Sequence, residues 1–276
     1  MQLKTILAET ESLPSAPQAV LELARTFEDE DAPTSDVVSA IEADPMLVVQ
    51  LLRLANSPAF FRGKLIDSTS EAVRLLGLSR VRSLVIGLLA RDAFPDVPEA
   101  ALDEIWRLSL ATADLSRHIA EVGGHDEEMC YLGGLLHLIG ELMLRVAMPE
   151  RLAELDQTVP LASPERAKAE VRTFGYSYCE AGAELMRRWR LPTRVVHIIE
   201  RQRNANLLVL RDLEAMAVQV AFWRVRALEL GQSEEEQQAA WPATFGRALR
   251  VEAADVIGWQ PPAPAGDEAG DTLPLA

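Results

Sequence analysis

Cysteine is nearly absent from this 276-residue chain, and long hydrophobic runs are missing altogether. The two cysteines, Cys130 and Cys179, each stand in an apolar stretch without a second cysteine at metal-ligand spacing, so we expect both to be reduced and buried. No segment approaches the roughly 18 consecutive apolar residues of a membrane-spanning helix. The first residues also lack the pattern of a signal peptide. The sequence therefore predicts a soluble, cytoplasmic protein with no membrane partner.

Positive charge and aromatic side chains are scarce as well. The chain carries 27 lysines and arginines against 42 acidic residues, a formal charge of -15 that repels nucleic acid phosphates at long range. Nucleic acid is thus not expected as the primary partner. Arg74, Arg80 and Arg82 lie close together, a pattern typical of a solvated helix face that still leaves a local basic site open. Hydrophobic residues reach 49%, mostly aliphatic, which suits packed helices.

Helical spacing of the apolar residues extends over almost the whole chain, and no run alternates as a strand does. We therefore predict an all-α protein. Pro95 and Pro98 interrupt the pattern, which indicates an N-terminal helical bundle over residues 1–95 packed against a second helical bundle over residues 96–258. The final segment, 259–276, is rich in proline, glycine and acidic residues and is expected to be a disordered tail.

Capping residues locate several of the predicted helices. Ser68-Thr69-Ser70-Glu71 matches a capping box, Gly77 should end the helix that follows, and Ser79 is expected to cap the next one. Asp44 is expected to cap a helix that begins at Pro45. Helices are predicted over residues 19–27, 34–41, 45–55, 72–76, 79–88, 99–122, 126–146, 164–173, 178–189, 192–203 and 207–230.

The stretch Gly133 to Gly140 is the most informative in the chain. Each glycine within a helix costs about 1 kcal/mol relative to alanine, so the glycines here need a packing reason. Close approach of another helix around His137 is the natural reason. A single histidine on such a face is more often a core residue than a ligand.

The same stretch is similar to the Gly-Leu-Leu-His-Asp-Ile-Gly motif of the HDOD family (the HD-related output domain) and of HD proteins, in which the adjacent His and Asp bind metal. Further motifs agree with HDOD in order and spacing over roughly residues 10–225. They are Leu13-Pro14, Ala16-Pro17, Asp44-Pro45, Leu51 to Ser57, Ala72, Leu75 to Leu78, Trp106, Ser109 to Ala113, Trp189 and Leu191-Pro192. The resemblance implies a bacterial signalling module whose second bundle is a degenerate HD-like bundle.

The resemblance also implies where an HD enzyme would hold its metal, and this chain departs from that pattern. Metal-dependent HD hydrolases need several His and Asp side chains that acidify a water and polarise a phosphate. The ligand positions that have changed hold Leu108, Leu138, Tyr178, Gln202 and Arg203. Only His137 persists. One neutral imidazole cannot hold a hydrolytic metal alone, so we expect no metal, no cofactor and no catalytic residue.

Other side chains could rebuild a metal site around His137. Glu141 lies four residues later and shares its helical face, while His118, His125 and His197 are the remaining histidines. No evident ligand set results. The sequence also contains no recognisable nucleophile paired with a base, and no phosphate-binding glycine loop after a strand.

The closely matching segment around Asn56 has two interpretations. Asn56 and Ser57 can end a helix through hydrogen bonds from their side chains to the backbone. Arg53, Asn56 and Ser57, together with His137, could instead contact a partner or a ligand. The sequence leaves both interpretations open.

We therefore predict a non-catalytic regulatory protein that acts by binding other signalling proteins. One alternative is a metal-dependent HD-type nucleotide or cyclic-dinucleotide phosphohydrolase that uses His137 with replacement ligands. Another is a small-molecule sensor with an apolar pocket near Leu108, Leu138 and His137. An interaction protein should expose an apolar patch, and Trp241 and Trp259 could mark such a docking surface.

Overall fold

The computed structural model describes residues 34–42, 45–56, 65–204 and 206–260, and within these ranges every regular element is a helix. The predicted all-α fold is confirmed. The predicted helix over residues 19–27, the Asp44 cap and residues 261–276 of the predicted tail lie outside the described ranges.

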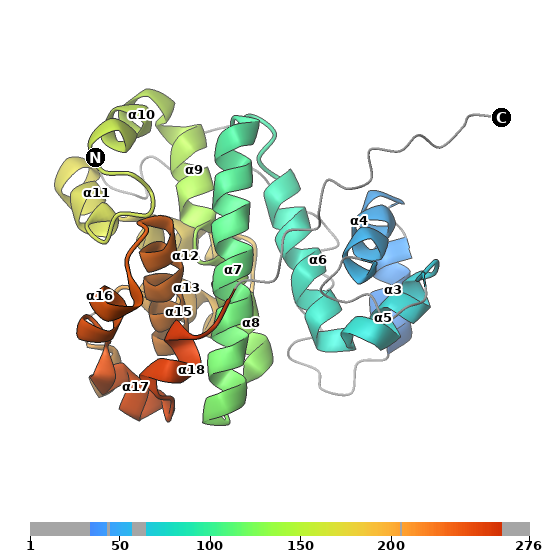
Figure 1. Cartoon of the computed structure of the whole chain (residues 1–276). Coiled ribbons are helices and arrows are strands. Elements are labelled where there is room, and N and C mark those ends of the chain that lie inside the picture. Colours follow the sequence, from blue (N-terminus) through green and yellow to red (C-terminus); the bar gives the residue numbers. More distant parts are fainter. Residues whose placement is uncertain (1–33, 43–44, 57–64, 205, 261–276) are drawn as a thin grey trace.

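The described part before Pro95 consists of four helices, named as in Figure 1: α3 (Thr34–Glu42), α4 (Pro45–Ala55), α5 (Thr69–Leu76) and α6 (Leu78–Asp92). The predicted cap of α5 is confirmed, because the Ser68 hydroxyl accepts a hydrogen bond of 3.3 Å from the Glu71 amide. Gly77, with φ +85°, ends α5 and immediately begins α6. Ser79 therefore lies inside α6 and does not cap it, contrary to the prediction.

The second group of helices begins with the long α7 (Glu99–Gly123), which agrees with the helix predicted over residues 99–122 and which Gly124 ends in a left-handed conformation. The others are α8 (Glu127–Leu136), α9 (Ile139–Ala147), α10 (Pro149–Thr158), α11 (Arg166–Phe174), α12 (Tyr178–Arg188), α13 (Thr193–Arg201), α14 (Leu207–Leu210), α15 (Leu213–Glu229), α16 (Glu234–Ala239), α17 (Ala243–Leu249) and α18 (Ala253–Ile257). The α7 helix packs along α8 and α15, α9 packs on α12, and α6 links α8 with the α3–α5 group (Figure 1).

Two predicted helices are broken in the structure. The helix expected over 126–146 divides at His137 and Leu138 into α8 and α9. The helix expected over 207–230 divides at Arg211, which takes a left-handed conformation with φ +53°, and the Asp212 side chain then caps α15. Helices α10 and α16 to α18 were not predicted, although Ser233 and Glu236 form a capping box that could have located α16.

The main hydrophobic cluster runs from Val37 in α3 to Val225 in α15, so the two predicted bundles share one core. A second cluster joins α7, α15, α17 and α18 around Leu115 and Leu249. Trp223, Trp241 and Trp259 pack against this second cluster, and the rings of Trp223 and Trp241 meet edge to face at 5.7 Å. Trp259, where the tail was predicted to begin, thus rests on the folded body.

One stretch, Glu127–Ala147, is long and apolar enough to cross a membrane by length and composition. It contains α8 and α9, and 89% of its most apolar part is buried inside the protein. The stretch therefore forms the centre of the core.

Candidate functional site

Glycines bring α7 and α12 close to the segment around His137, which follows the last residue of α8. A Cβ atom on Gly134 would lie 2.6 Å from the Cα atom of Ala113 in α7, and one on Gly140 would lie 1.9 Å from the carbonyl oxygen of Tyr178 in α12. Neither backbone can give way, so only glycine fits at these two places. The predicted packing reason for the glycines is confirmed.

The His137 side chain is completely buried and makes one hydrogen bond. Its Nδ1 atom lies 2.6 Å from the carbonyl oxygen of Gly134, and because a carbonyl only accepts, Nδ1 carries the proton. Its Nε2 atom has no hydrogen-bond partner, and the ring meets the ring of Phe222 at 4.3 Å. Burial lowers the pKa of His137 to about 3. The imidazole is therefore neutral at physiological pH.

Three of the altered ligand positions around His137 belong to the hydrophobic core. Leu108 of α7, Leu138 and Tyr178 of α12 are all buried in the main cluster. Burial also raises the pKa of the Tyr178 phenol well above its usual value. These side chains fill space by apolar packing, and the two leucines offer no donor atom to a metal.

The other two altered positions bind the backbone. Gln202 is buried and donates from Nε2 to the carbonyl oxygen of His137 at 2.7 Å, while its Oε1 atom has no hydrogen-bond partner. Arg203 donates from Nη2 to the carbonyl oxygen of Pro164 at 2.9 Å. Gln202 thus holds the break between α8 and α9, and Arg203 is directed to the surface loop before α11.

The residues of this site do not fit the metal that HD proteins hold. Within the described ranges, no group of three or more His, Cys, Asp or Glu side chains comes together as a metal would require. Two of the other histidines are accounted for elsewhere: His125 bonds to the Leu249 carbonyl oxygen at 2.9 Å, and His197 lines a separate cavity beside Arg194.

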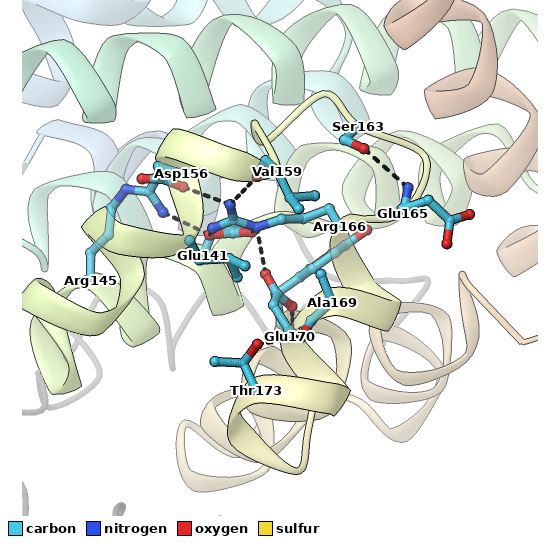
Figure 2. Close-up of polar contacts among 12 residues, drawn as sticks. Glu141, Arg145, Asp156, Val159, Ser163, Glu165, Arg166, Ala169, Glu170 and Thr173 are labelled. Atoms are coloured by element: carbon cyan, nitrogen blue, oxygen red, sulfur yellow. Dashed lines mark hydrogen bonds and ion pairs between the residues drawn. The ribbon is translucent and has the colours of Figure 1, made fainter.

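Glu141, the residue considered as a replacement ligand, binds arginines instead. Its two carboxylate oxygens accept hydrogen bonds of 2.9 and 3.0 Å from Arg166 of α11 and one of 2.7 Å from Arg145. The same Arg166 guanidinium also reaches Glu170 at 2.8 Å and Asp156 at 2.6 Å (Figure 2). Glu141, Arg166 and Glu170 are almost fully buried, so they form an ion cluster inside the protein, where α9, α10, α11 and α12 meet.

The two glutamates of this ion cluster differ in protonation. Burial and the neighbouring Glu141 charge raise the pKa of Glu170 to about 10, although Arg166 and the amide of Tyr178 oppose this. Burial alone would also raise the pKa of Glu141, but the Arg166 and Arg145 guanidiniums lower it below its usual value. Glu170 therefore carries a proton at neutral pH and shares it with the ionised Glu141.

The sequence signals for the ion cluster were present but incomplete. Glu141 with Arg145, and Arg166 with Glu170, are pairs spaced four residues apart, a spacing that equally describes exposed helix faces. The contact between Glu141 and Arg166 spans 25 residues, and nothing in the local pattern predicts it.

The predicted partner contacts around Asn56 are only partly described. The Asn56 amide donates to the carbonyl oxygens of Leu52 at 2.8 Å and Ile66 at 2.7 Å, and its Oδ1 accepts from the Ile66 amide at 2.7 Å. These bonds agree with the helix-ending interpretation. The Arg53 side chain and Ser57 lie outside the described residues, so their role stays a prediction.

An apolar surface that the sequence did not predict lies on α14. Val209 is 83% exposed, and its neighbours Leu208 and Leu210 are exposed as well. Three successive exposed aliphatic side chains on one short helix form a larger apolar surface than the single exposed residues that are normal on a folded protein.

Comparison with known proteins shows which family this chain matches. The model of the HDOD domain matches residues 13–205, which is more than half of the chain. An uncharacterized protein of Treponema pallidum is 28% identical over 202 residues, which are 72% of this chain and 39% of that protein. The chain thus spans well under half of this relative.

Solved structures agree on the fold. An inferred phosphohydrolase from Shewanella amazonensis aligns with a TM-score of 0.75 at 24% identity, covering 92% of this chain and 91% of that one. An HDOD domain protein of unknown function from Geobacter sulfurreducens aligns with a TM-score of 0.69 at 23% identity, covering 92% and 95%. An inferred signal transduction protein from Marinobacter aquaeolei gives 0.66 at 24% identity, covering 91% of this chain and 60% of that one.

Proposed function

This chain belongs to the HDOD domain family, and we propose that it is a non-catalytic bacterial signal-transduction protein that acts by binding other signalling proteins. One observation carries the proposal. His137, which matches the metal-binding histidine of the family motif, is a buried neutral imidazole surrounded by packed side chains. A hydrolytic metal needs several ligands and an open position for water, and neither is provided here.

The exposed apolar surface of α14 supports the interaction part of the proposal. Side chains such as that of Val209 are available to a partner without any rearrangement of the core. The formal charge of -15 favours protein partners over nucleic acid, and the cytoplasm is the expected location.

A metal-dependent phosphohydrolase is the main competing function, since one structural neighbour from Shewanella amazonensis is described as a phosphohydrolase and a second as a metal-dependent phosphohydrolase. Those neighbours are under 25% identical and share the fold alone. A sensor that uses the former active site is less well supported. Leu108, Leu138 and His137 are buried in the core, and none of them lines one of the described cavities.

The enzymatic alternative is tested by hydrolysis assays on the purified full chain. Bis-p-nitrophenyl phosphate and cyclic dinucleotides would be incubated with the protein and added manganese, iron or zinc. We expect no turnover above that of a His137→Ala variant. Metal-dependent turnover that the His137→Ala substitution abolishes would refute the proposal.

The interaction is tested by cross-linking and recovery of the full chain from its own cells. Arg53→Ala and Ser57→Ala variants test the predicted partner contacts, and Val209→Ser tests the α14 surface. Arg74→Ala is a matched control, because the Arg74 side chain is 77% exposed and only distantly paired with Glu71. We expect one or more signalling proteins to be lost with at least one test variant and retained with the control. Identical recovery from all of them would count against both surfaces.

A further inference from the structure

A cleft of about 340 Å³ opens between the junction of α5 with α6 and the helices α7 and α8. Its lining does not include His137, so the cleft is separate from the site described above. Gly77 and Leu78 contribute the junction, Arg117 comes from α7 and Tyr131 from α8. The cleft therefore lies where the N-terminal helices meet the HD-like bundle.

The N-terminus of α6 is open toward this cleft. The first hydrogen bond of the helix joins the Val81 amide to the Gly77 carbonyl oxygen, so the amides of residues 78–80 precede the ladder. No side chain caps them, because the residue at the cap is Gly77. A Cβ atom on Gly77 would meet nothing within 4 Å, so there is open space beside Gly77. Uncapped amides at the positive end of a 15-residue helix favour an anion.

A second observation points to a ligand in the same place. Ser83, one turn further along α6, lines the cleft and is completely buried, and its hydroxyl has no hydrogen-bond partner. Buried hydroxyls without a partner are rare in folded proteins because they are costly. A ligand oxygen in the cleft would supply the missing acceptor or donor.

Two arginine side chains line the cleft beside two glutamates. Arg80 and Arg117 line it, and Arg82 stands behind it with its Nε atom 2.8 Å from Glu128. Glu127 and Glu128 also line the cleft, so its charged lining is balanced on a strongly acidic protein. Arg117 is bound to Glu127 by a partly exposed contact of 3.3 Å, and such pairs contribute little, so an incoming anion can replace the carboxylate.

We propose that this cleft binds the phosphate group of a small phosphorylated molecule of about mononucleotide size. The phosphate lies at the α6 N-terminus between Arg80 and Arg117, and one of its oxygens bonds to the Ser83 hydroxyl. A volume of about 340 Å³ lies within the range of small-molecule sites. The inference does not rest on the proposed function, because it uses none of the residues around His137.

The position of the cleft suggests what binding does. The ligand touches α6 of the N-terminal group and α7 and α8 of the HD-like bundle, so it stabilises their present arrangement. Binding to the folded state alone also raises the temperature of unfolding. The cleft would thus connect the concentration of a metabolite to the arrangement of the two groups of helices.

Isothermal titration calorimetry on the full chain at low salt tests the proposal. Pyrophosphate probes phosphate chemistry alone, and 5′-AMP and 5′-GMP probe phosphate with a base. We expect at least one probe to bind with a Kd of about 1 mM or tighter. Ser83→Ala and Arg117→Gln should each weaken binding about tenfold, since each removes a hydrogen bond to a charged ligand. Ser83→Ala should fold normally because it removes an unsatisfied hydroxyl.

Two matched variants separate the cleft from general effects. Ser116 of α7 is also completely buried with an unpartnered hydroxyl, but it does not line the cleft. Arg107 of α7 pairs with Glu229 away from it. Ser116→Ala and Arg107→Gln should leave the Kd unchanged.

Three results would overturn the proposal. The first is no binding of any probe at about 10 mM, a concentration far above that of a specific site. The second is binding that the cleft variants leave unchanged, or that the controls weaken equally. The third is binding of a phosphoserine peptide in the absence of binding by the small probes, which would assign the cleft to a protein partner.

Discussion

His137 and Glu141 lie one helical turn apart, yet the protein buries their polar groups in opposite ways. Around His137 the imidazole remains neutral with one ring nitrogen unpaired, and the buried Arg226, whose guanidinium lies 4.7 Å from the Phe222 ring, adds to the effect of burial in lowering its pKa. Around Glu141 the charges are kept, and two arginines surround the carboxylate. The first region keeps its buried titratable side chain neutral, and the second keeps the charge of its carboxylate and compensates it.

The comparison explains why neither region offers a metal site. A metal needs lone pairs from several side chains that converge on one point. Near His137 the altered ligand positions hold two leucines, a tyrosine, a glutamine and an arginine, and at Glu141 the arginines already occupy the lone pairs. The two regions should therefore respond differently to substitution and to pH.

The largest effect is expected in the compensated region. Arg166→Met leaves Glu141 and Glu170 buried without their main partner, and breaking a buried ion pair in this way costs about 3–5 kcal/mol of unfolding free energy. Urea unfolding at pH 7 would measure it. Arg91→Met is the matched control, because the pair of Arg91 with Asp103 is largely exposed and should be worth under about 1 kcal/mol. If both variants lost the same unfolding free energy, burial would make no difference to the strength of an ion pair in this protein.

A smaller effect is expected for His137 on acidification. Its folded pKa of about 3 lies below the ordinary value of 6.5, so the stability it contributes is present above pH 6.5 and is lost as the pH falls toward 3. Between pH 7 and pH 5 this amounts to about 2 kcal/mol. His137→Leu cannot be protonated and should lose that much less over the same interval, as unfolding curves at both pH values would show. If His137→Leu lost as much unfolding free energy between pH 7 and pH 5 as the wild type, the pKa of His137 would not be lowered by folding, which would contradict its burial as a neutral group.

The smallest effect is expected for Glu170→Gln. At about pH 4, where the Glu170 carboxyl is largely protonated in both the folded and the unfolded state, a neutral amide resembles it, and the substitution should cost about 1 kcal/mol, the value of one imperfect hydrogen bond. The pH dependence is more informative. The folded pKa is raised, so its contribution is complete below about pH 4.5 and is lost as the pH rises toward 10. The variant should therefore lose less stability than the wild type between pH 6 and pH 9, and a steeper loss would show that Glu170 is ionised.

The sequence predicted much of the fold because the signals for α5 and α7 are local. Ser68 and Gly124 act within one turn of the helix they end or begin. The break at His137 could not be predicted in the same way. It depends on Gly140 lying against the Tyr178 carbonyl oxygen and on Gln202 holding the His137 carbonyl oxygen, contacts with α12 and α13 that lie far along the chain.

In the candidate site, too, the features set by local sequence could be predicted and those set by packing between helices could not. The altered ligand positions, such as Leu108 and Leu138, could be named from the family motif because they follow its spacing. The partners of Glu141 and the unsatisfied Ser83 hydroxyl could not, because burial and hydrogen bonding are set by packing between helices. Residue type alone did not distinguish Ser83 from a serine on a solvated face.

The metal content of the purified protein tests the central claim most directly. Elemental analysis would be made on the full chain as isolated and after exposure to manganese, iron and zinc. We expect far less than one metal ion per chain in every sample, with no difference between the wild type and His137→Ala. A metal present at nearly one per chain and lost in His137→Ala would contradict the account, because the buried imidazole would then be a ligand.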